Sequence, residues 1–334
     1  MQSLTASGER PPADLIVWDE AHHCTASTYR DVANAYPSAR HLGLTATPVR
    51  TDGTALGNVF DRLVVLATVR ELQAEGWLVP CDVVAPPKRL RGGDIADDPI
   101  DAWTKHANGR RTVLFSANVA HAKDVAERFR AIGVTAASLD GTTPKDERDD
   151  VLARFRAGAI TVVANAYILT EGWDCPEAEV CILARGCGSV AMFLQCVGRV
   201  LRPAAGKDRA LLIDLGGAVH EHGMPDDDRT FSLEGTPIRP TNRSAPIRQC
   251  PRCGAVFRPK PVCPRCGAEM PKPPPPAIRH VGIGEVGAVS PVDTKTRYLE
   301  MLAGIAASRG YKSGWVAHKF KARFGHWPAS RVSS

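Results

Sequence analysis

Residues 15–22 read LIVWDEAH, an apolar run that ends in two acids and is closed by a histidine. Four consecutive apolar residues are typical of a strand that is buried on both faces of a parallel sheet. Open α/β sheets carry their chemistry at the carboxyl ends of such strands. The stretch therefore predicts an α/β fold with Asp19 and Glu20 at a functional edge.

Two acids at a strand end suit phosphoryl transfer, which needs a ligand for Mg²⁺ and a group that orients the attacking water. Asp19 fits the first role and Glu20 fits the second. An isolated Asp-Glu pair also ends many ordinary strands, so the motifs that follow decide between the two interpretations.

Apolar runs and helical patterns alternate along residues 1–238. Strands are expected at 15–18, 41–45, 112–115, 135–139, 160–164, 180–183 and 210–214, and helices at 27–35, after Asn118, after Pro144 and at 189–200. This alternation predicts a parallel sheet with helices on both faces.

The size and charge of the chain limit its class. Its 334 residues, 44% of them apolar, suffice for two domains with small appendages. No run approaches the roughly 20 apolar residues of a membrane helix, and the N-terminus shows no signal region, so we expect a cytoplasmic protein without a membrane partner. Residues 239–334 hold 17 Lys/Arg against 4 Asp/Glu, whereas 1–238 hold 25 against 32. The basic tail favours a polyanion partner, although solubility alone could explain it.

Four of the ten cysteines form two close pairs, Cys250 with Cys253 and Cys263 with Cys266. Each pair belongs to a Cys-Pro-Arg-Cys-Gly turn, and two such turns complete a tetrahedral Cys₄ site for structural Zn²⁺. A redox motif fits poorly, because no βαβ context surrounds the pairs. The arginines inside the turns, Arg252 and Arg265, are candidate nucleic-acid contacts.

Three more polar blocks follow predicted strands or lie on a predicted helix. Thr45 and Thr47 stand in TATP at 45–48, and residues 170–174 read TEGWD. Residues 195–202 read QCVGRVLR, which on a helix would put Arg199 and Arg202 on one face. Two planar cations on one face suit the phosphates of a nucleotide, although a solvated basic face is the alternative.

Taken in this order, the four blocks resemble motifs II, III, V and VI of superfamily 2 helicases, closest to the repair-type DEAH-box branch that is common in phages and prophages. The resemblance covers residues 14–238. It implies two RecA-like lobes, with ATP and Mg²⁺ in the cleft between them and nucleic acid across both. By analogy with the repair-type branch, DNA is favoured over RNA.

The resemblance also implies roles by position. Asp19 would hold Mg²⁺, Glu20 would activate water, and His22 would couple hydrolysis to the other lobe. The remaining positions divide between the ATP site (Thr45, Thr47, Gly172, Asp174, Gln195), the arginine fingers (Arg199, Arg202) and the nucleic-acid backbone (Thr170).

One part of the family pattern is missing from the sequence. No GxxxxGK[ST] phosphate loop occurs in the 334 residues, and Gly206-Lys207, the only Gly-Lys pair, is expected to be a turn. We therefore expect the chain alone to be inactive with ATP. Either a separate polypeptide supplies the loop, or the chain is a truncated product, or it is a non-catalytic zinc-ribbon protein that binds nucleic acid.

The expected organisation is α/β: two RecA-like parallel-sheet lobes, the first incomplete, with a small zinc ribbon and a helical tail. The tail should be a helical pair with apolar stripes at Leu299, Leu302, Ile305 and Ala306 and at Val316, Phe320 and Phe324. The expected boundaries are 1–85 for the first lobe, 86–101 for a linker, 102–238 for the second lobe, 246–270 for the ribbon, 271–292 for a Pro-rich linker and 293–334 for the basic tail.

Overall fold

The computed structural model describes residues 11–24, 26–49, 55–88, 90, 94–166, 168–234, 247–271, 291–309, 311 and 313–328. Two compact units make up the chain, Met1–Lys272 and Pro273–Ser334. The linker expected at 271–292 lies almost wholly outside the described residues.

An eight-stranded sheet forms the centre of the first unit, in the order β5-β6-β4-β7-β8-β3-β10-β9. Its strands are β3 (Cys81–Val84), β4 (Thr112–Ser116), β5 (Ala136–Leu139), β6 (Val162–Asn165), β7 (Val180–Ala184), β8 (Ala210–Asp214), β9 (Arg248–Gln249) and β10 (Ala255–Phe257). Neighbours from β5 to β3 run parallel. The predicted α/β class with a parallel sheet is confirmed.

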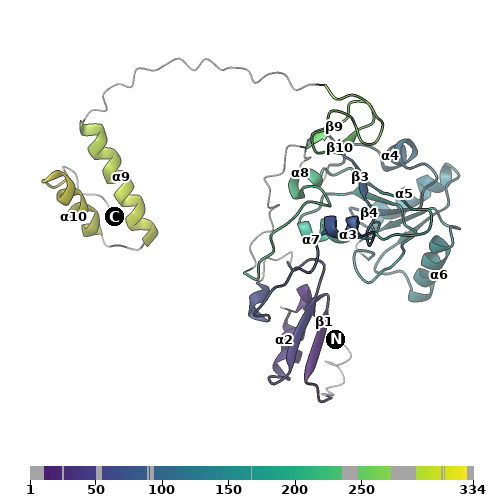
Figure 1. Cartoon of the computed structure of the whole chain (residues 1–334), viewed down its shortest axis with the longest axis horizontal. Coiled ribbons are helices and arrows are strands. Elements are labelled where there is room, and N and C mark those ends of the chain that lie inside the picture. The colour runs from purple at the N-terminus through teal and green to yellow at the C-terminus, as the bar shows by residue number, and fades with distance from the viewer. Residues whose placement is uncertain are drawn as a thin grey trace. The chain divides into compact units, whose positions relative to one another are not determined.

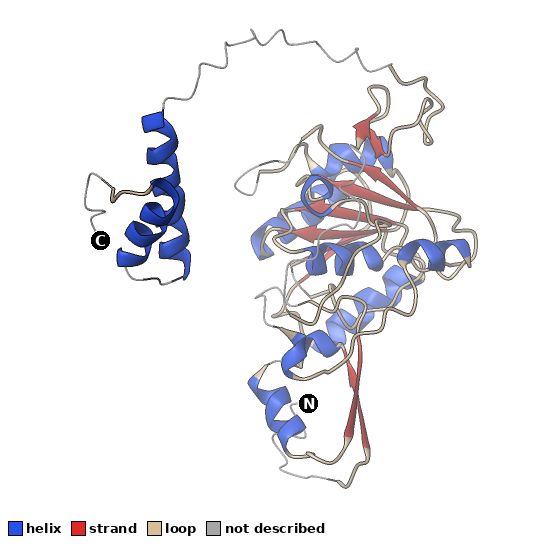
Figure 2. Ribbon diagram, turned by 60° about the vertical axis from the view of Figure 1, so that its left-hand side comes forward, coloured by secondary structure: helices blue, strands red, loops and turns tan. Residues whose placement is uncertain are grey.

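Helices cover both faces of this sheet (Figures 1 and 2). Trp103 of α4 (Pro99–His106) and Phe129 of α5 (Val119–Ala131) belong to one buried cluster, with Leu114 of β4. Phe155 of α6 (Lys145–Arg156) and Phe193 of α7 (Val190–Gly198) belong to the other. Short helix α8 (Val219–His222) follows β8. Because β4 sends alternate side chains into the two clusters, both faces are buried, as its continuous apolar sequence predicts.

A separate two-stranded sheet contains the first motif. Strand β1 (Leu15–Asp19) pairs in parallel with β2 (Arg40–Leu44). Helix α2 (Ser27–Asn34) lies beside them in Figure 1, and its Val32 shares a small core with Trp18 and Ala21. The other side chains of the strands, Leu15, Val17, Leu42 and Leu44, stay 46–55% exposed. One face of this sheet is therefore apolar and uncovered within the described chain.

The boundary between the two lobes differs from the expected one. After η2 (Leu56–Asn58) and α3 (Val69–Ala74), strand β3 pairs with β8 instead of extending the first sheet. Residues 81–84 had been assigned to the first lobe, but hydrogen bonding places them in the larger sheet. The ribbon is not detached either, because β10 pairs antiparallel with β3.

The second unit contains two helices, α9 (Pro291–Arg309) and α10 (Ser313–Phe324). Leu302 and Ala306 of α9 pack against Val316 and Phe320 of α10, which confirms the predicted helical pair. Over the described residues, no helix combines the length and apolarity that crossing a membrane requires.

Candidate functional site

The first motif forms a tight turn where β1 ends. Glu20 has φ 49° and ψ 51°, and among the described residues it is the one non-glycine with positive φ. A left-handed residue costs roughly 1–2 kcal/mol, so this turn is held against a local preference. The 3₁₀ turn η1 (Ala21–His23) follows at once and directs two consecutive histidines away from the strand. Asp19 is exposed at the strand end.

His22 joins the two lobes. Its Nδ1 lies 3.0 Å from Oγ1 of Thr45 and 3.5 Å from a carboxylate oxygen of Glu20. Its Nε2 lies 3.3 Å from Oε1 of Glu171 and 3.3 Å from Nε2 of Gln195. The first two partners belong to the first lobe and the last two to the second. His22 therefore links motifs II and III to motifs V and VI.

Glu171 is the centre of this network. Gln195 Nε2 donates to its Oε1 at 3.0 Å, and His23 Nε2 lies 2.9 Å from its Oε2. Burial raises the pKa of Glu171, but hydrogen bonds and charge interactions with His23 and His22 outweigh it and lower the pKa. Burial, aided by His23, lowers the pKa of His22. The carboxylate is thus favoured as an anion beside a neutral His22 ring.

The two arginines converge on the loop of motif V. Arg199 Nη1 donates to the Trp173 carbonyl at 2.6 Å, and Arg202 pairs with the Asp174 carboxylate. Helix α7 ends at Gly198, so Arg199 caps it and Arg202 lies beyond it. The expectation that both lie on one helical face is wrong, yet the loop brings both guanidinium groups to one place.

Glycine at 172 allows the turn of this loop. Gly172 has φ +67°, a conformation that L side chains rarely adopt. It stands between Glu171, which contacts the histidines, and Trp173, whose carbonyl accepts from the arginines. Thr170 before it is half-buried.

A cavity of about 720 Å³ separates the two sets of motifs. Glu20, Thr45 and Thr47 line it from the first lobe, and Gln195, Arg199 and Arg202 line it from the second. Thr47 is buried, and its Oγ1 has no hydrogen-bond partner among the described residues. The volume falls within the roughly 300–1,000 Å³ of small-molecule sites. Carboxylate, hydroxyl and cationic groups therefore face one ligand-sized space.

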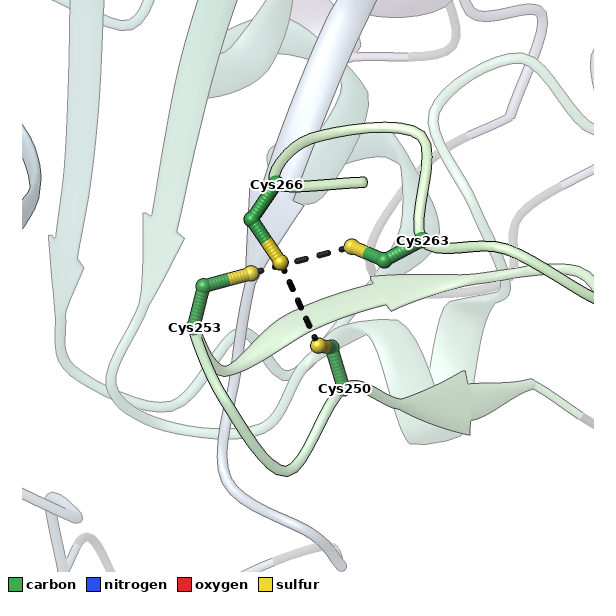
Figure 3. Close-up of side chains that lie close together, drawn as sticks. All are labelled: Cys250, Cys253, Cys263 and Cys266. Atoms are coloured by element: carbon green, nitrogen blue, oxygen red, sulfur yellow. Dashed lines mark hydrogen bonds between the residues drawn. The ribbon is translucent and has the colours of Figure 1, made fainter. Parts of the chain in front are cut away.

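The four paired cysteines converge in the ribbon (Figure 3). Sγ of Cys250 lies 3.7 Å from that of Cys266, and Cys253 and Cys263 are equally far apart. Zinc–sulfur bonds of about 2.3 Å place tetrahedral ligands about 3.8 Å apart, so the thiols fit Zn²⁺. Desolvation opposes the thiolate of Cys250, but backbone N–H groups of Cys253 and Arg252 and the neighbouring cysteines lower its pKa to about 7.

The basic residues of the ribbon have different surroundings. Arg252 is exposed. Arg265 instead donates to the carbonyl and to Nδ1 of His106 at the end of α4, at 3.0 and 3.1 Å. Its guanidinium fastens the ribbon to the second lobe, while Arg252 is the one of the pair that faces solvent.

Two residues of the network, His23 and Glu171, were not among the predicted site residues. Both stand beside predicted positions, His23 after His22 and Glu171 between Thr170 and Gly172. The sequence offered two signals, the adjacent histidines His22 and His23 and the acid Glu171 inside the TEGWD block. Their pairing spans 148 positions of the chain, which no local pattern predicts.

Comparison with known proteins agrees with this geometry. Residues 96–204 match the helicase conserved C-terminal domain, and residues 3–50 match the type III restriction enzyme, res subunit. The "51.5 kDa protein" of a Lactococcus phage is 32% identical over 265 residues, covering 73% of this chain and 58% of the relative. The "Putative ATP-dependent helicase IRC3" of Saccharomyces cerevisiae is 28% identical over 235 residues, covering 61% and 34%.

The fold has solved counterparts. A fragment structure described as a putative HsdR subunit of a type I restriction enzyme from Vibrio vulnificus aligns with a TM-score of 0.51. It is 23% identical, with 67% of this chain and 46% of that chain covered. This likeness concerns the fold alone. The chain spans less than three fifths of the length of the two curated relatives above.

Proposed function

Because the chain belongs to the superfamily 2 helicases, we propose that the cavity between its lobes is the nucleotide site of an ATP-dependent DNA helicase or translocase. The observation that carries the proposal is the lining of that cavity. Glu20 and the Thr45–Thr47 loop face Gln195, Arg199 and Arg202 across a space of about 720 Å³. These are the groups that hydrolysis of a phosphoanhydride requires, because positioning and charge stabilisation account for most of phosphoryl-transfer catalysis.

Each residue has a part in this proposal. Asp19 holds Mg²⁺, which neutralises phosphate charge when bound, and Glu20 orients the attacking water. Arg199 and Arg202 leave Trp173 and Asp174 for the phosphates, since carbonyl and carboxylate partners can be exchanged for phosphate oxygens. Thr45, Thr47 and Gln195 line the cavity beside them, and Gly172 and Asp174 belong to the ATP site through the loop that the arginines contact.

His22 couples the site to the second lobe in this proposal. It contacts Thr45 on one side and Glu171 and Gln195 on the other. A change in nucleotide state that moves Glu20 or Thr45 therefore reaches motif V directly. Thr170, one residue before Glu171, contacts the nucleic-acid backbone in this scheme.

The phosphate loop comes from polypeptide outside the 334 residues. The uncovered apolar face of β1 and β2 supports this part of the proposal, since Leu15, Val17, Leu42 and Leu44 are about half exposed there. A monomer rarely leaves such a contiguous face to water. Packing of the loop-bearing segment on this face would bring it beside Asp19.

DNA contacts in the proposal are basic and partly zinc-dependent. Zn²⁺ held by the four cysteines fixes the turn that presents Arg252 to solvent. Arg265 contributes to DNA binding in one of two ways. It holds the ribbon to His106, or it exchanges that contact for a DNA phosphate. Contacts of Arg252 and Arg265 with DNA would be to its phosphate backbone, which gives affinity without sequence selection.

The decisive experiment compares the 334-residue chain with the same chain combined with the polypeptide encoded directly upstream in its natural DNA. Calorimetry should detect no micromolar ATP binding by the chain alone. The combination should hydrolyse ATP in a DNA-dependent manner, and R199A or R202A should lower kcat by about 10³–10⁵-fold. Arg154→Ala is the matched control, because Arg154 is exposed on α6 and, among the described residues, its side chain pairs with Asp150 one turn away.

Two outcomes would contradict parts of the proposal. Micromolar ATP binding by the chain alone, lost in R202A, would show that no external loop is needed. DNA binding without hydrolysis by the combination would favour a non-catalytic nucleic-acid-binding protein.

A further inference from the structure

Three side chains with metal-binding atoms converge where the two lobes meet, apart from the ribbon. They are His22 and His23 from η1 and Glu171 from motif V, and their ligand atoms all lie within 4.8 Å of one another. Consecutive histidines rarely point to one place in a strand, because side chains alternate there. The tight turn η1 brings both rings to the same carboxylate, with ring centroids 4.2 Å apart.

Two of the separations, which end on the two oxygens of Glu171, are close to those between the ligands of a tetrahedral ion. Zinc bonds of about 2.0–2.1 Å to nitrogen and oxygen put neighbouring ligands about 3.3 Å apart. His22 Nε2 lies 3.3 Å from Glu171 Oε1, and His23 Nε2 lies 2.9 Å from Glu171 Oε2. The shorter separation, between His23 Nε2 and Glu171 Oε2, would lengthen to this value after small rotations of the exposed His23 ring and of the carboxylate.

The surroundings supply the second layer of such a site. A metal-binding imidazole uses its other nitrogen to hold an oxygen partner, which fixes the ring. Nδ1 of His22 already lies 3.0 Å from Thr45 Oγ1. Nε2 of Gln195 lies 3.0 Å from Glu171 and 3.3 Å from His22 Nε2, so rotation of this amide would bring its oxygen to a fourth position.

The site is also accessible. His22 is almost fully buried, but the side chains of His23 and Glu171 are 40% and 34% exposed. An ion can therefore enter without unfolding either lobe. Two imidazoles and one carboxylate are the ligand set of borderline divalent ions, such as Zn²⁺, rather than of Mg²⁺ or Ca²⁺.

We propose that His22, His23 and Glu171 form a second zinc-class site that joins the two lobes. Its ligands come from both lobes, so the bound ion holds the lobes in the arrangement seen here. The ion competes with the hydrogen bonds of Glu171 and thus acts as a brake on movements between motif II and motif V. This assignment does not depend on ATP hydrolysis.

The test counts zinc. The full chain is dialysed to equilibrium against micromolar Zn²⁺ at neutral pH, and zinc per chain is measured by atomic emission. Wild type should bind one zinc ion more than H23A or E171Q. E171Q keeps the shape of the side chain but removes its charge. His121→Ala is the control and should match wild type, because His121 lies on α5 outside the cluster.

A second variant separates the zinc of the proposed site from the zinc of the ribbon. Cys253→Ser removes one ribbon ligand, so this variant should keep only the ion of the second site. Adding H23A to it should remove that ion as well. Equal zinc in wild type and H23A, with the ribbon ion retained in both, would overturn the proposal. The proposal would also be overturned if H23A bound no zinc and C253S alone bound no zinc either, because C253S should still hold the ion of the second site.

Discussion

Lys207 illustrates how single residues hold the site in place. The residue is 7% exposed, and its ammonium group donates to the carbonyls of Pro176, Ala178 and Arg202 at 2.7, 2.6 and 2.8 Å. Burial lowers the pKa of Lys207 to about 8. One cation thus fastens the segment after motif V to the segment that carries Arg202.

Replacing Lys207 by Met should therefore affect stability and activity. Three carbonyls would lose their donor, and an unsatisfied buried group costs about 1–3 kcal/mol, so we expect a loss of roughly 3 kcal/mol or more. Urea unfolding measures it. Lys145→Met, at an exposed position of α6, should change stability by less than about 0.5 kcal/mol. Equal midpoints for the two variants would contradict this role.

The expectation for this position was only partly adequate. Gly206 occupies a turn with φ 75°, as the Gly-Lys pair predicts. The burial of Lys207 was not predictable, because two of its three acceptors lie about 30 positions earlier in the chain. The same limitation explains why Glu171 was missed, whereas Asp19, Glu20 and His22 follow directly from one strand and its end.

Among the elements, the ribbon has a structural role that its sequence does not reveal. Strand β10 pairs with β3 and so covers an edge of the large sheet, with Val256 opposite Val83 and Ala255 opposite Val84. Gln249 Nε2 also donates to the Ala85 carbonyl at 2.7 Å. The four cysteines therefore stabilise a sheet edge as well as their own turns.

Removal of zinc should expose that edge. Chelation, or C253S, should unfold the ribbon, because four thiols alone replace little of the metal's binding free energy of about 10–16 kcal/mol. Hydrogen exchange at the amides of β3 should accelerate at least tenfold, and the protein should associate through the open edge. Cys24→Ser, in the small core beside Trp18, should leave exchange in β3 unchanged. Unchanged β3 protection in the chelated protein would refute this role.

Strand positions followed from the sequence better than strand partners did. The apolar runs at 112–115, 180–183 and 210–214 became β4, β7 and β8 almost as predicted. Pairing of 81–84 with 255–257 brings together segments about 170 residues apart, and composition carries no signal for such a contact. The pairing of β3 with β8 is also long-range, and it places residues 81–84 in the larger sheet instead of the expected first lobe.

On the scale of the whole molecule, the chain consists of two units with separate cores. The second unit depends on a few side chains, Leu302, Ala306, Val316 and Phe320, with Tyr298, Leu299, Trp315 and Phe324 around them. The core between two helices of this size contributes only a small net free energy of folding.

Phe320→Ala should therefore unfold the helical pair without affecting Met1–Lys272. Truncating a buried Phe costs about 3–5 kcal/mol, which exceeds what so small a core supplies. The amide resonances of α9 and α10 should lose their chemical-shift dispersion. The midpoint temperature of the main thermal transition, that of the first unit, should stay unchanged. Lys319→Ala, on the exposed side of α10, is the control. A matching shift of the main transition in F320A would show that the two units are coupled.

The position of β3 in the sheet has a mechanical consequence. This strand carries the chain out of the first lobe, and it lies between β8 on one side and β10 on the other. Tension applied between the two lobes would run along the axis of β3. Its hydrogen bonds to both neighbours are then loaded in shear, so they must break together and cannot peel apart one by one. Pairing with β10 therefore gives this connecting strand an anchor on its second side.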